Sequence, residues 1–271
     1  MAFTNNQGAQ IYWDQQGRGA PVLLIMGLGW ASNMWHRTRP VLTSSYYTVA
    51  FDNRGAGRSD VPPGPYSIPL LASDAAAVLD AAGVERAHLI GASMGGMIAQ
   101  EFALQYPHRV RSLTLLCTAP GGTHAVQAQP EVLQALFQPD PDPAKRAAVV
   151  VPFIYDQSTP RDRVDHDLKV LSEFYPNPVG YAAQLQAIMA WEAYSRLPQI
   201  TAPTLVIHGE SDRLVPPGNA DRIAERIPGA KLVKIPHASH ILMTDQPVAV
   251  HVAVLDFLAA QSHVGMPQHA T

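Results

Sequence analysis

Short apolar runs recur along the chain and alternate with longer stretches in which apolar residues follow a helical period. Most of the short runs are continuously apolar, as expected for strands that are buried on both faces of a sheet. Strands alternating with helices are typical of a mostly parallel sheet with helices on both faces. The strands are predicted at residues 9–15, 21–27, 47–52, 87–92, 110–118, 203–209 and 230–236.

The helical pattern is clearest in three of the longer stretches. Gly83 is expected to end the first helix, because glycine favours the residues just after a helix. Pro247 is expected to begin the last one, because proline is tolerated in the first turn. The helices are predicted at residues 68–83, 94–106 and 247–261.

The pattern of short apolar runs is interrupted in one long part of the chain, residues 120–198. This part contains many prolines and is expected to be helical. With 271 residues and 47% hydrophobic content, the chain suits one α/β domain with an insertion better than two independent domains. We therefore expect a core formed by residues 1–119 and 199–271, with residues 120–198 inserted between two strands.

The composition argues against several classes of protein. The formal net charge is −3 and no run of Lys or Arg is present, so we expect no nucleic-acid or membrane partner. No apolar stretch reaches the roughly 18 residues of a membrane span, and the N-terminus lacks the pattern of a secretory signal. The single cysteine, Cys117, allows no internal disulfide, which fits the cytoplasmic location that we expect.

One serine stands among small residues between a predicted strand and a predicted helix. Residues 91–95, GASMG, fit the pattern G-x-S-x-G of a nucleophile elbow centred on Ser93. A sharp strand-to-helix turn needs unusual backbone angles and close chain contacts, both of which are easiest for glycine. The alternative is a tight glycine turn whose serine only caps the helix.

Four motifs together resemble the α/β-hydrolase family, and the resemblance covers nearly the whole chain. Besides the elbow, residues 51–60 are similar to the D-x-R-G-x-G-x-S turn of that family, 203–216 to its acid-bearing strand and loop, and 235–247 to its histidine loop. The motifs follow the order of the family. The resemblance implies a mostly parallel, doubly wound sheet and identifies residues 120–198 as a helical cap.

The resemblance also assigns a base and an acid to the serine. Asp212 follows an apolar strand by a short polar turn, which places it at the edge of the sheet where open α/β folds gather their sites. Glu210 is its local rival. His240 matches the family's histidine, whereas His237 is expected to be a loop histidine. A metal pair formed by these two histidines is disfavoured, because no helix and no third ligand is evident.

These parts predict acyl transfer. His240, oriented by Asp212, would take the proton of Ser93 as the hydroxyl attacks a carbonyl carbon. The backbone N–H of Met94 is one expected donor to the oxyanion, and that of Leu28 is the other. In the family, the loop containing Leu28 usually begins with His-Gly, but here Met26 replaces the histidine. A backbone donor survives that change.

Other polar residues near the motifs are expected to be structural. Asp52, Arg54 and Ser59 belong to the turn motif and should hold that turn together. Cys117, in an apolar strand, is expected to be a small core residue.

Substrate choice should rest on the loop after the second strand and on the cap. No basic cluster in the cap suggests a site for phosphate or carboxylate, so we expect an apolar pocket. Aromatic side chains at helical spacing usually form core, and only part of them should line a pocket. The predicted substrate-binding residues are Trp30, Phe137, Phe153 and Trp191.

The sequence thus predicts a serine hydrolase that cleaves a small to medium, largely apolar ester or lactone without a cofactor or metal. A carbon–carbon bond hydrolase, an enol-lactonase, a thioesterase or an amidase could use the same triad. An aspartate nucleophile, as in haloalkane dehalogenases and epoxide hydrolases, is excluded by Ser93. A ligand receptor that turns over slowly is the alternative from another class.

Overall fold

The core of the molecule is a twisted sheet, seen here in a computed structural model that describes residues 2–137 and 143–262. The described residues form eight strands in the order β1-β2-β4-β3-β5-β6-β7-β8. β1 pairs antiparallel with β2, and β2 antiparallel with β4, whereas the other neighbours are parallel. The predicted mostly parallel sheet is confirmed. The strands are β1 (Ala2–Asn6), β2 (Ala9–Gln16), β3 (Ala20–Ile25), β4 (Tyr46–Phe51), β5 (Ala87–Ala92), β6 (Val110–Leu116), β7 (Thr204–Gly209) and β8 (Lys231–Ile235).

The central strands are apolar because both of their faces are covered. Every residue of β5 and of β7 is buried, as the continuous apolar runs predict. β1 is different: its sequence, AFTNN, alternates between exposed and half-buried positions at the edge of the sheet. The sequence pattern missed this strand, because a short polar edge strand lacks the apolar run that marks the others.

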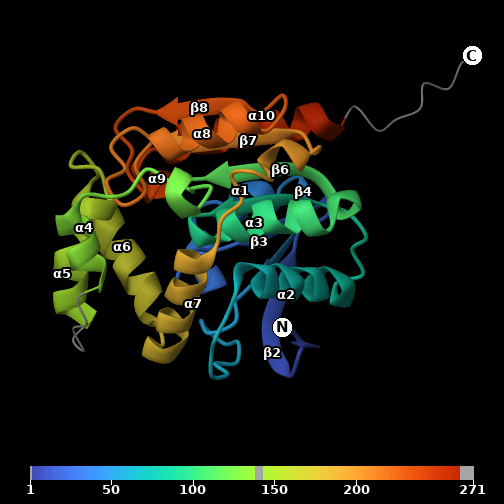
Figure 1. Ribbon diagram of the computed structural model, residues 1–271, viewed down its shortest axis with the longest axis horizontal. Helices are drawn as coiled ribbons and strands as arrows, with labels where there is room; N and C mark the ends of the chain where they lie inside the picture. Colours follow the sequence, from blue (N-terminus) through green and yellow to red (C-terminus); the bar gives the residue numbers. More distant parts are fainter. Residues whose placement is uncertain (1, 138–142, 263–271) are drawn as a thin grey trace, which may run out of the picture.

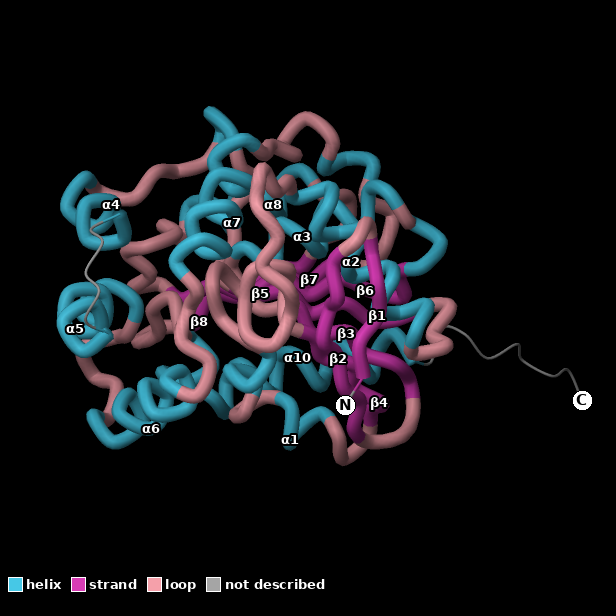
Figure 2. The backbone as a smooth tube through the Cα atoms, turned by 90° about the horizontal axis from the view of Figure 1, so that it is seen from below, coloured by secondary structure: helices cyan, strands magenta, loops and turns pink. Residues whose placement is uncertain are grey.

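Helices cover both faces of the sheet (Figure 2). Leu71, Ile98 and Ile223 pack in the core on one face, and Leu42 and Val254 in the core on the other. The first set comes from α2 (Ile68–Ala81), α3 (Met94–Gln105) and α8 (Gly218–Arg226), and the second from α1 (Arg39–Leu42) and α10 (Pro247–Ser262).

The ends of α2 show how local sequence sets a helix. The Ser67 hydroxyl accepts a hydrogen bond from Leu70 N–H at the start of the helix. Gly83 has a φ of +66°, and Val84 N–H bonds back to Leu79 O. The predicted glycine stop is therefore present, although the last helical residue is Ala81.

The stretch between β6 and β7 contains the helical insertion. Figure 1 shows α4, α5 and α6 beyond the ends toward which the arrows of β6 and β8 point. This is the edge of the sheet where α/β folds bind ligands. The limits of a separate cap at residues 120 and 198 stay a prediction. The insertion contains η3 (Gly122–His124), α4 (Pro130–Phe137), α5 (Pro143–Ile154), α6 (Arg161–Ser172), α7 (Pro178–Ala190) and η4 (Leu197–Gln199).

Three short helical turns complete the described elements. They are η1 (Ser32–Trp35), η2 (Pro107–Arg109) and α9 (Leu242–Asp245). In the described ranges, no helix combines the length and the apolar character that crossing a bilayer requires.

Candidate active site

Ser93 occupies the sharp turn between β5 and α3. Its φ is +55° and its ψ is −121°, an unusual conformation for a residue with a side chain. A Cβ atom at Gly91 would overlap the backbone of Gly95, and one at Gly95 would overlap Ile25 O. The two glycines therefore permit the close packing that forces the turn. The Ser93 side chain makes no capping hydrogen bond to α3.

The backbone of this turn is also held from β6 and the residues that follow it. Ser93 N–H donates to Leu116 O at 2.9 Å, and the Thr118 hydroxyl donates to Ser93 O at 2.7 Å. These hydrogen bonds use the backbone groups of Ser93 and leave its hydroxyl outside the hydrogen bonds of the turn.

Asp212 and His240 form a buried pair. His240 Nδ1 lies 2.8 Å from Asp212 Oδ2, and Leu214 N–H and Val215 N–H donate to Asp212 Oδ1 at 3.0 and 2.9 Å. Burial alone would raise the pKa of the Asp212 carboxyl, but His240 and His208 lower it to about 2. Asp212 is thus an anion near neutral pH and can fix the Nδ1–H tautomer of His240.

His208 is a neighbour of this pair that the sequence motifs do not single out. Its Nε2 lies 2.7 Å from Val215 O and 3.2 Å from Asp212 Oδ2, and the side chain is fully buried. It stands four residues before the aspartate, at the end of β7. That spacing is the only sequence signal that could have found it, because the contact needs the turn after β7.

The rival residues lie elsewhere. Glu210 and His237 are both exposed, and His237 has a φ of +53° in the loop before His240. Within residues 2–137 and 143–262, no three His, Cys, Asp or Glu side chains are grouped so that they could hold a metal ion.

The residues of the turn motif hold the backbone together. Asp52 accepts from Ser32 N–H and from Arg58, and Arg54 pairs with Asp74 at 2.7 Å. The Ser59 hydroxyl donates to Asp52 O. These side chains are occupied by the fold, as the sequence analysis expected.

The loop after β3 lies directly beside the nucleophile. A Cβ atom at Gly27 would stand 3.1 Å from Ser93 Cβ and 3.6 Å from Ser93 Oγ. The Asn53 side chain donates to Met26 O, and Gly29 N–H donates to the Gln184 side chain at 2.7 Å.

The N–H groups of this loop differ in how they are used. Trp30 N–H is bonded to Gly27 O at 3.3 Å, and Gly29 N–H is bonded to Gln184. Leu28 N–H has no hydrogen-bond acceptor among the described residues. Met94 is the first residue of α3, where a backbone N–H has no partner within the helix.

A cavity of about 870 Å³ opens onto these groups. Ser93, His240, Leu28 and Met94 all line it, and most of its remaining wall is apolar. Its size suits a small molecule. The main aliphatic contributions from the insertion are Leu133, Val150, Val151, Leu168, Leu185 and Ile188.

Cys117 also lines this cavity, in addition to its place in the core. Burial, and then the negative charge of Asp212, raise the pKa of the Cys117 thiol. The neutral thiol is a poor nucleophile.

The cavity wall is less uniformly apolar than the sequence analysis expected. Arg146 of α5 lines it, with its guanidinium 4.4 Å from the ring centroid of Tyr181. The pKa of Tyr181 is raised above its ordinary value, because burial raises it by more than the charge of Arg146 lowers it. Among the described lining residues, Arg146 is the one permanent cation, and Asp167 is already bound by Arg37.

The four residues predicted to bind substrate do not share one environment. Trp30 lines the cavity. Phe153 is half-buried beside Arg213, and Trp191 is buried with its indole N–H donating to Glu101 at 2.8 Å, so neither is among the lining residues. Phe137 ends α4, and its side chain lies outside the part of the chain that the structure describes.

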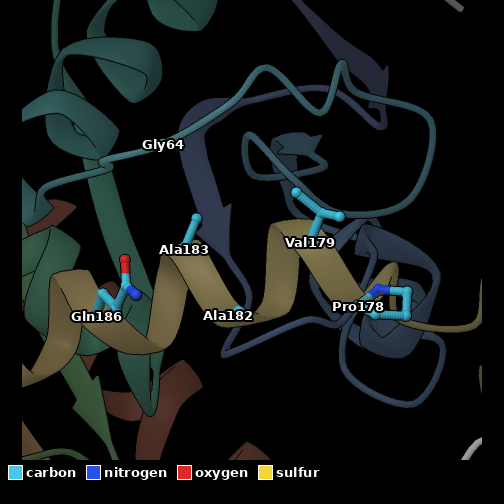
Figure 3. A pocket seen from close by; sticks show the side chains of 6 residues that line it. All are labelled: Gly64, Pro178, Val179, Ala182, Ala183 and Gln186. Atoms are coloured by element: carbon cyan, nitrogen blue, oxygen red, sulfur yellow. The ribbon is translucent and has the colours of Figure 1, made fainter.

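A second hollow, of about 440 Å³, lies on the outer side of α7. Figure 3 shows Val179, Ala183 and Gln186 of α7 around it, opposite the loop that carries Gly64. Its described lining has no titratable group. We assign it no chemistry.

The fold and the site define an α/β-hydrolase, and comparisons with known proteins agree. A family model described as the alpha/beta hydrolase fold matches residues 20–247. The chain therefore belongs to the α/β-hydrolase family.

Three relatives align with this chain over most of its length. The chain is 34% identical over 245 residues to a poly(3-hydroxyalkanoate) depolymerase of Ectopseudomonas oleovorans. The aligned region covers 88% of this chain and 84% of the depolymerase. A thermophilic esterase of Thermogutta terrifontis has a TM-score of 0.82 and 27% identity, and covers 96% of this chain and 97% of its own. The enol-lactonase of Burkholderia xenovorans has a TM-score of 0.82 and 26% identity, with 95% and 100% covered.

Proposed function

We propose that this protein is a serine hydrolase that cleaves small to medium carboxylic esters or lactones through an acyl-enzyme. The observation that carries this proposal is the hydrogen-bonded pair of Asp212 and His240 on the same cavity as the strained Ser93. The relatives named as an esterase, an enol-lactonase and a poly(3-hydroxyalkanoate) depolymerase support this proposal.

The first half of the reaction forms the acyl-enzyme. Ser93 Oγ bonds to the carbonyl carbon while its proton passes to His240 Nε2, and Asp212 stabilises the resulting imidazolium. The N–H groups of Leu28 and Met94 stabilise the oxyanion. The carbon–oxygen bond then breaks, and the leaving alkoxide takes the proton from His240.

The second half releases the acid. Water gives a proton to His240 as its oxygen attacks the acyl carbon, and Ser93 Oγ recovers that proton when it leaves. No step needs a metal or a cofactor. The apolar wall excludes water from the rest of the substrate and strengthens the electrostatic interactions inside the site.

Covalent labelling tests the nucleophile. A fluorophosphonate should label the wild type and leave Ser93→Ala unlabelled, while circular dichroism shows both folded. Equal labelling would contradict the assignment. Sustained release of nitrophenol from a short-chain ester, rather than a single burst, would separate the enzyme from a slow-turnover receptor. A panel of esters, lactones and ring-cleavage products would then rank ester hydrolysis against carbon–carbon bond hydrolysis.

A second candidate, within the same chemistry, is a substrate that carries a carboxylate. The observation that favours it is the half-buried Arg146 in a largely apolar wall, because a guanidinium can bind a carboxylate through two parallel hydrogen bonds. Tyr181, which Arg146 contacts, packs against the nucleophile side of the cavity, since a Cβ atom at Gly29 would lie 2.7 Å from its ring. The Tyr181 ring thus contacts both Arg146 and the loop after β3.

Half-esters of dicarboxylic acids test this candidate. The wild type should prefer a monomethyl dicarboxylate over the dimethyl ester of the same length, and Arg146→Met should lose that preference. Lys145→Met is the matched control, because Lys145 is the exposed neighbour on the same helix. An unchanged preference in Arg146→Met would remove the candidate without affecting ester hydrolysis itself.

A further inference from the structure

Gln184 is a buried polar residue of the cap helix α7 whose side chain reaches into the core. Its Oε1 accepts from Gly29 N–H at 2.7 Å, and its Nε2 donates to Arg54 O at 2.7 Å. The side chain is fully buried. One amide of the insertion therefore bridges the loop beside the nucleophile and the turn after β4.

Helix α7 is seated too closely for this contact to be incidental. A Cβ atom at Gly180 would overlap Gly55 O, so the helix backbone lies directly on the turn after β4. Asn177 caps the helix by accepting from Val179 N–H and Gly180 N–H. The position of Gln184 is thus set by a rigid helix rather than by a mobile loop.

The loop after β3 is held at two points. The Asn53 amide donates to Met26 O on one side of Leu28, and Gln184 accepts from Gly29 N–H on the other. Gly29 has a φ of +72°, which lets its N–H turn away from the nucleophile toward α7. Leu28 N–H then remains as the donor that is not used by the loop.

We propose that Gln184 is a positioning residue through which helix α7 fixes the conformation of the loop after β3, residues 26–30. The proposal rests on the function proposed above. Gln184 does not line the cavity and does not contact the triad, but it fixes the peptide between Leu28 and Gly29, while Asn53 fixes the peptide between Met26 and Gly27. The intervening peptide, which carries Leu28 N–H, is then held from both sides. The oxyanion hole then reaches its active geometry only when α7 is docked on the core.

The first test removes both hydrogen bonds. Gln184→Leu should lower kcat for a short acetate ester by roughly 10- to 100-fold, somewhat less than the loss of a whole oxyanion donor. KM for that ester should change little, because so small a substrate makes few contacts with the cap. Gln186→Leu is the matched control on the exposed side of the same helix.

The second test restores one bond at a time. In Gln184→Glu, the ionised carboxylate can accept from Gly29 N–H but repels Arg54 O, whereas the neutral acid can make both bonds. The Arg54 guanidinium is held by Asp74 and Asn6 O. The ratio of variant to wild-type kcat should therefore rise toward one as the pH falls.

The outcomes separate the two proposals. Loss of activity in Ser93→Ala together with full kcat in folded Gln184→Leu would overturn the role of Gln184 alone. Activity retained in Ser93→Ala would overturn the proposed function. A ratio for Gln184→Glu that stays well below one at every pH would reduce Gln184 to a stabilising residue and would also contradict the proposal.

Discussion

The sheet edge and the cap contribute to the same cavity in different ways. At the sheet edge, the backbone places each reactive group: glycines force the turn at Ser93, and two N–H groups orient Asp212. The cap supplies mostly aliphatic wall from its helices. Under the function proposed above, we expect the core to determine the reaction and the insertion to determine which molecules reach it.

A few buried polar residues connect the two regions. Asp167 of α6 contacts His36 and Arg37 beside η1 and accepts from the Thr244 hydroxyl of α9 at 2.5 Å. Hydrogen bonds from His36 and Thr244, and the charge of Arg37, lower the pKa of Asp167 although burial raises it. These contacts join the insertion to the core, and a buried polar network whose groups are satisfied favours one packing arrangement.

The largest effect should come from the base. His240→Ala should lower kcat by about 10⁴–10⁶-fold, because His240 is the one histidine among the described residues that line the cavity with Ser93. His237→Ala, three residues earlier and exposed, should change kcat less than about threefold. Steady-state kinetics with a nitrophenyl ester measure both. The reverse ranking would show that the wrong histidine was assigned.

Loss of one oxyanion donor should come next. Leu28→Pro deletes the backbone N–H and should lower kcat by about 10²–10³-fold, whereas Leu28→Ala keeps the donor and should cost little. Circular dichroism must show Leu28→Pro folded. Full activity in that folded variant would mean that the second donor lies elsewhere.

A smaller effect, on stability, should come from Asp245, where the insertion contacts the core. This buried carboxylate accepts from Thr159 of the insertion and from Ser239 N–H. Burial raises its pKa from an ordinary value of 3.8 to about 6, despite the hydrogen bonds that lower it. The folded state then binds the proton more tightly than the unfolded state does.

The sign of the pH dependence follows from that difference. The contribution of Asp245 to the free energy of unfolding is largest below about pH 4 and is lost as the pH rises through 6, by up to about 3 kcal/mol. Urea denaturation from pH 4 to 7 measures it. Asp245→Asn should remove this part of the pH dependence, and identical curves for both proteins would contradict the raised pKa.

The smallest effect should be on selectivity. Trp30 belongs to the loop after β3 and lines the cavity, so Trp30→Ala should alter the ratio of kcat/KM for hexanoate and acetate esters several-fold while nearly preserving the acetate rate. Val179→Ala, on the exposed face of α7, is the control. A uniform loss for all chain lengths would place Trp30 in the catalytic apparatus instead.

Local patterns determined a large part of this protein. Short apolar runs, most of them continuous, identified seven strands of the sheet, and glycine spacing identified the elbow at Ser93. Both signals are local, because backbone geometry and burial constrain residues that are near in sequence. The order of Ser93, Asp212 and His240 could also be read from motifs, and the structure brings Asp212 and His240 within hydrogen-bonding distance. The sequence pattern did not predict β1, because an edge strand needs no apolar run.

Tertiary structure alone decided how the cap meets the core. Gln184 bonds to Gly29, which lies 155 positions away, and Trp191 bonds to Glu101 instead of lining the cavity. Arg146 lines the cavity although no basic cluster surrounds it in the sequence. An amphipathic helix pattern states which face is buried but not against what, because the docking of α7 depends on close contacts such as Gly55 with Gly180 that form only after the chain has folded.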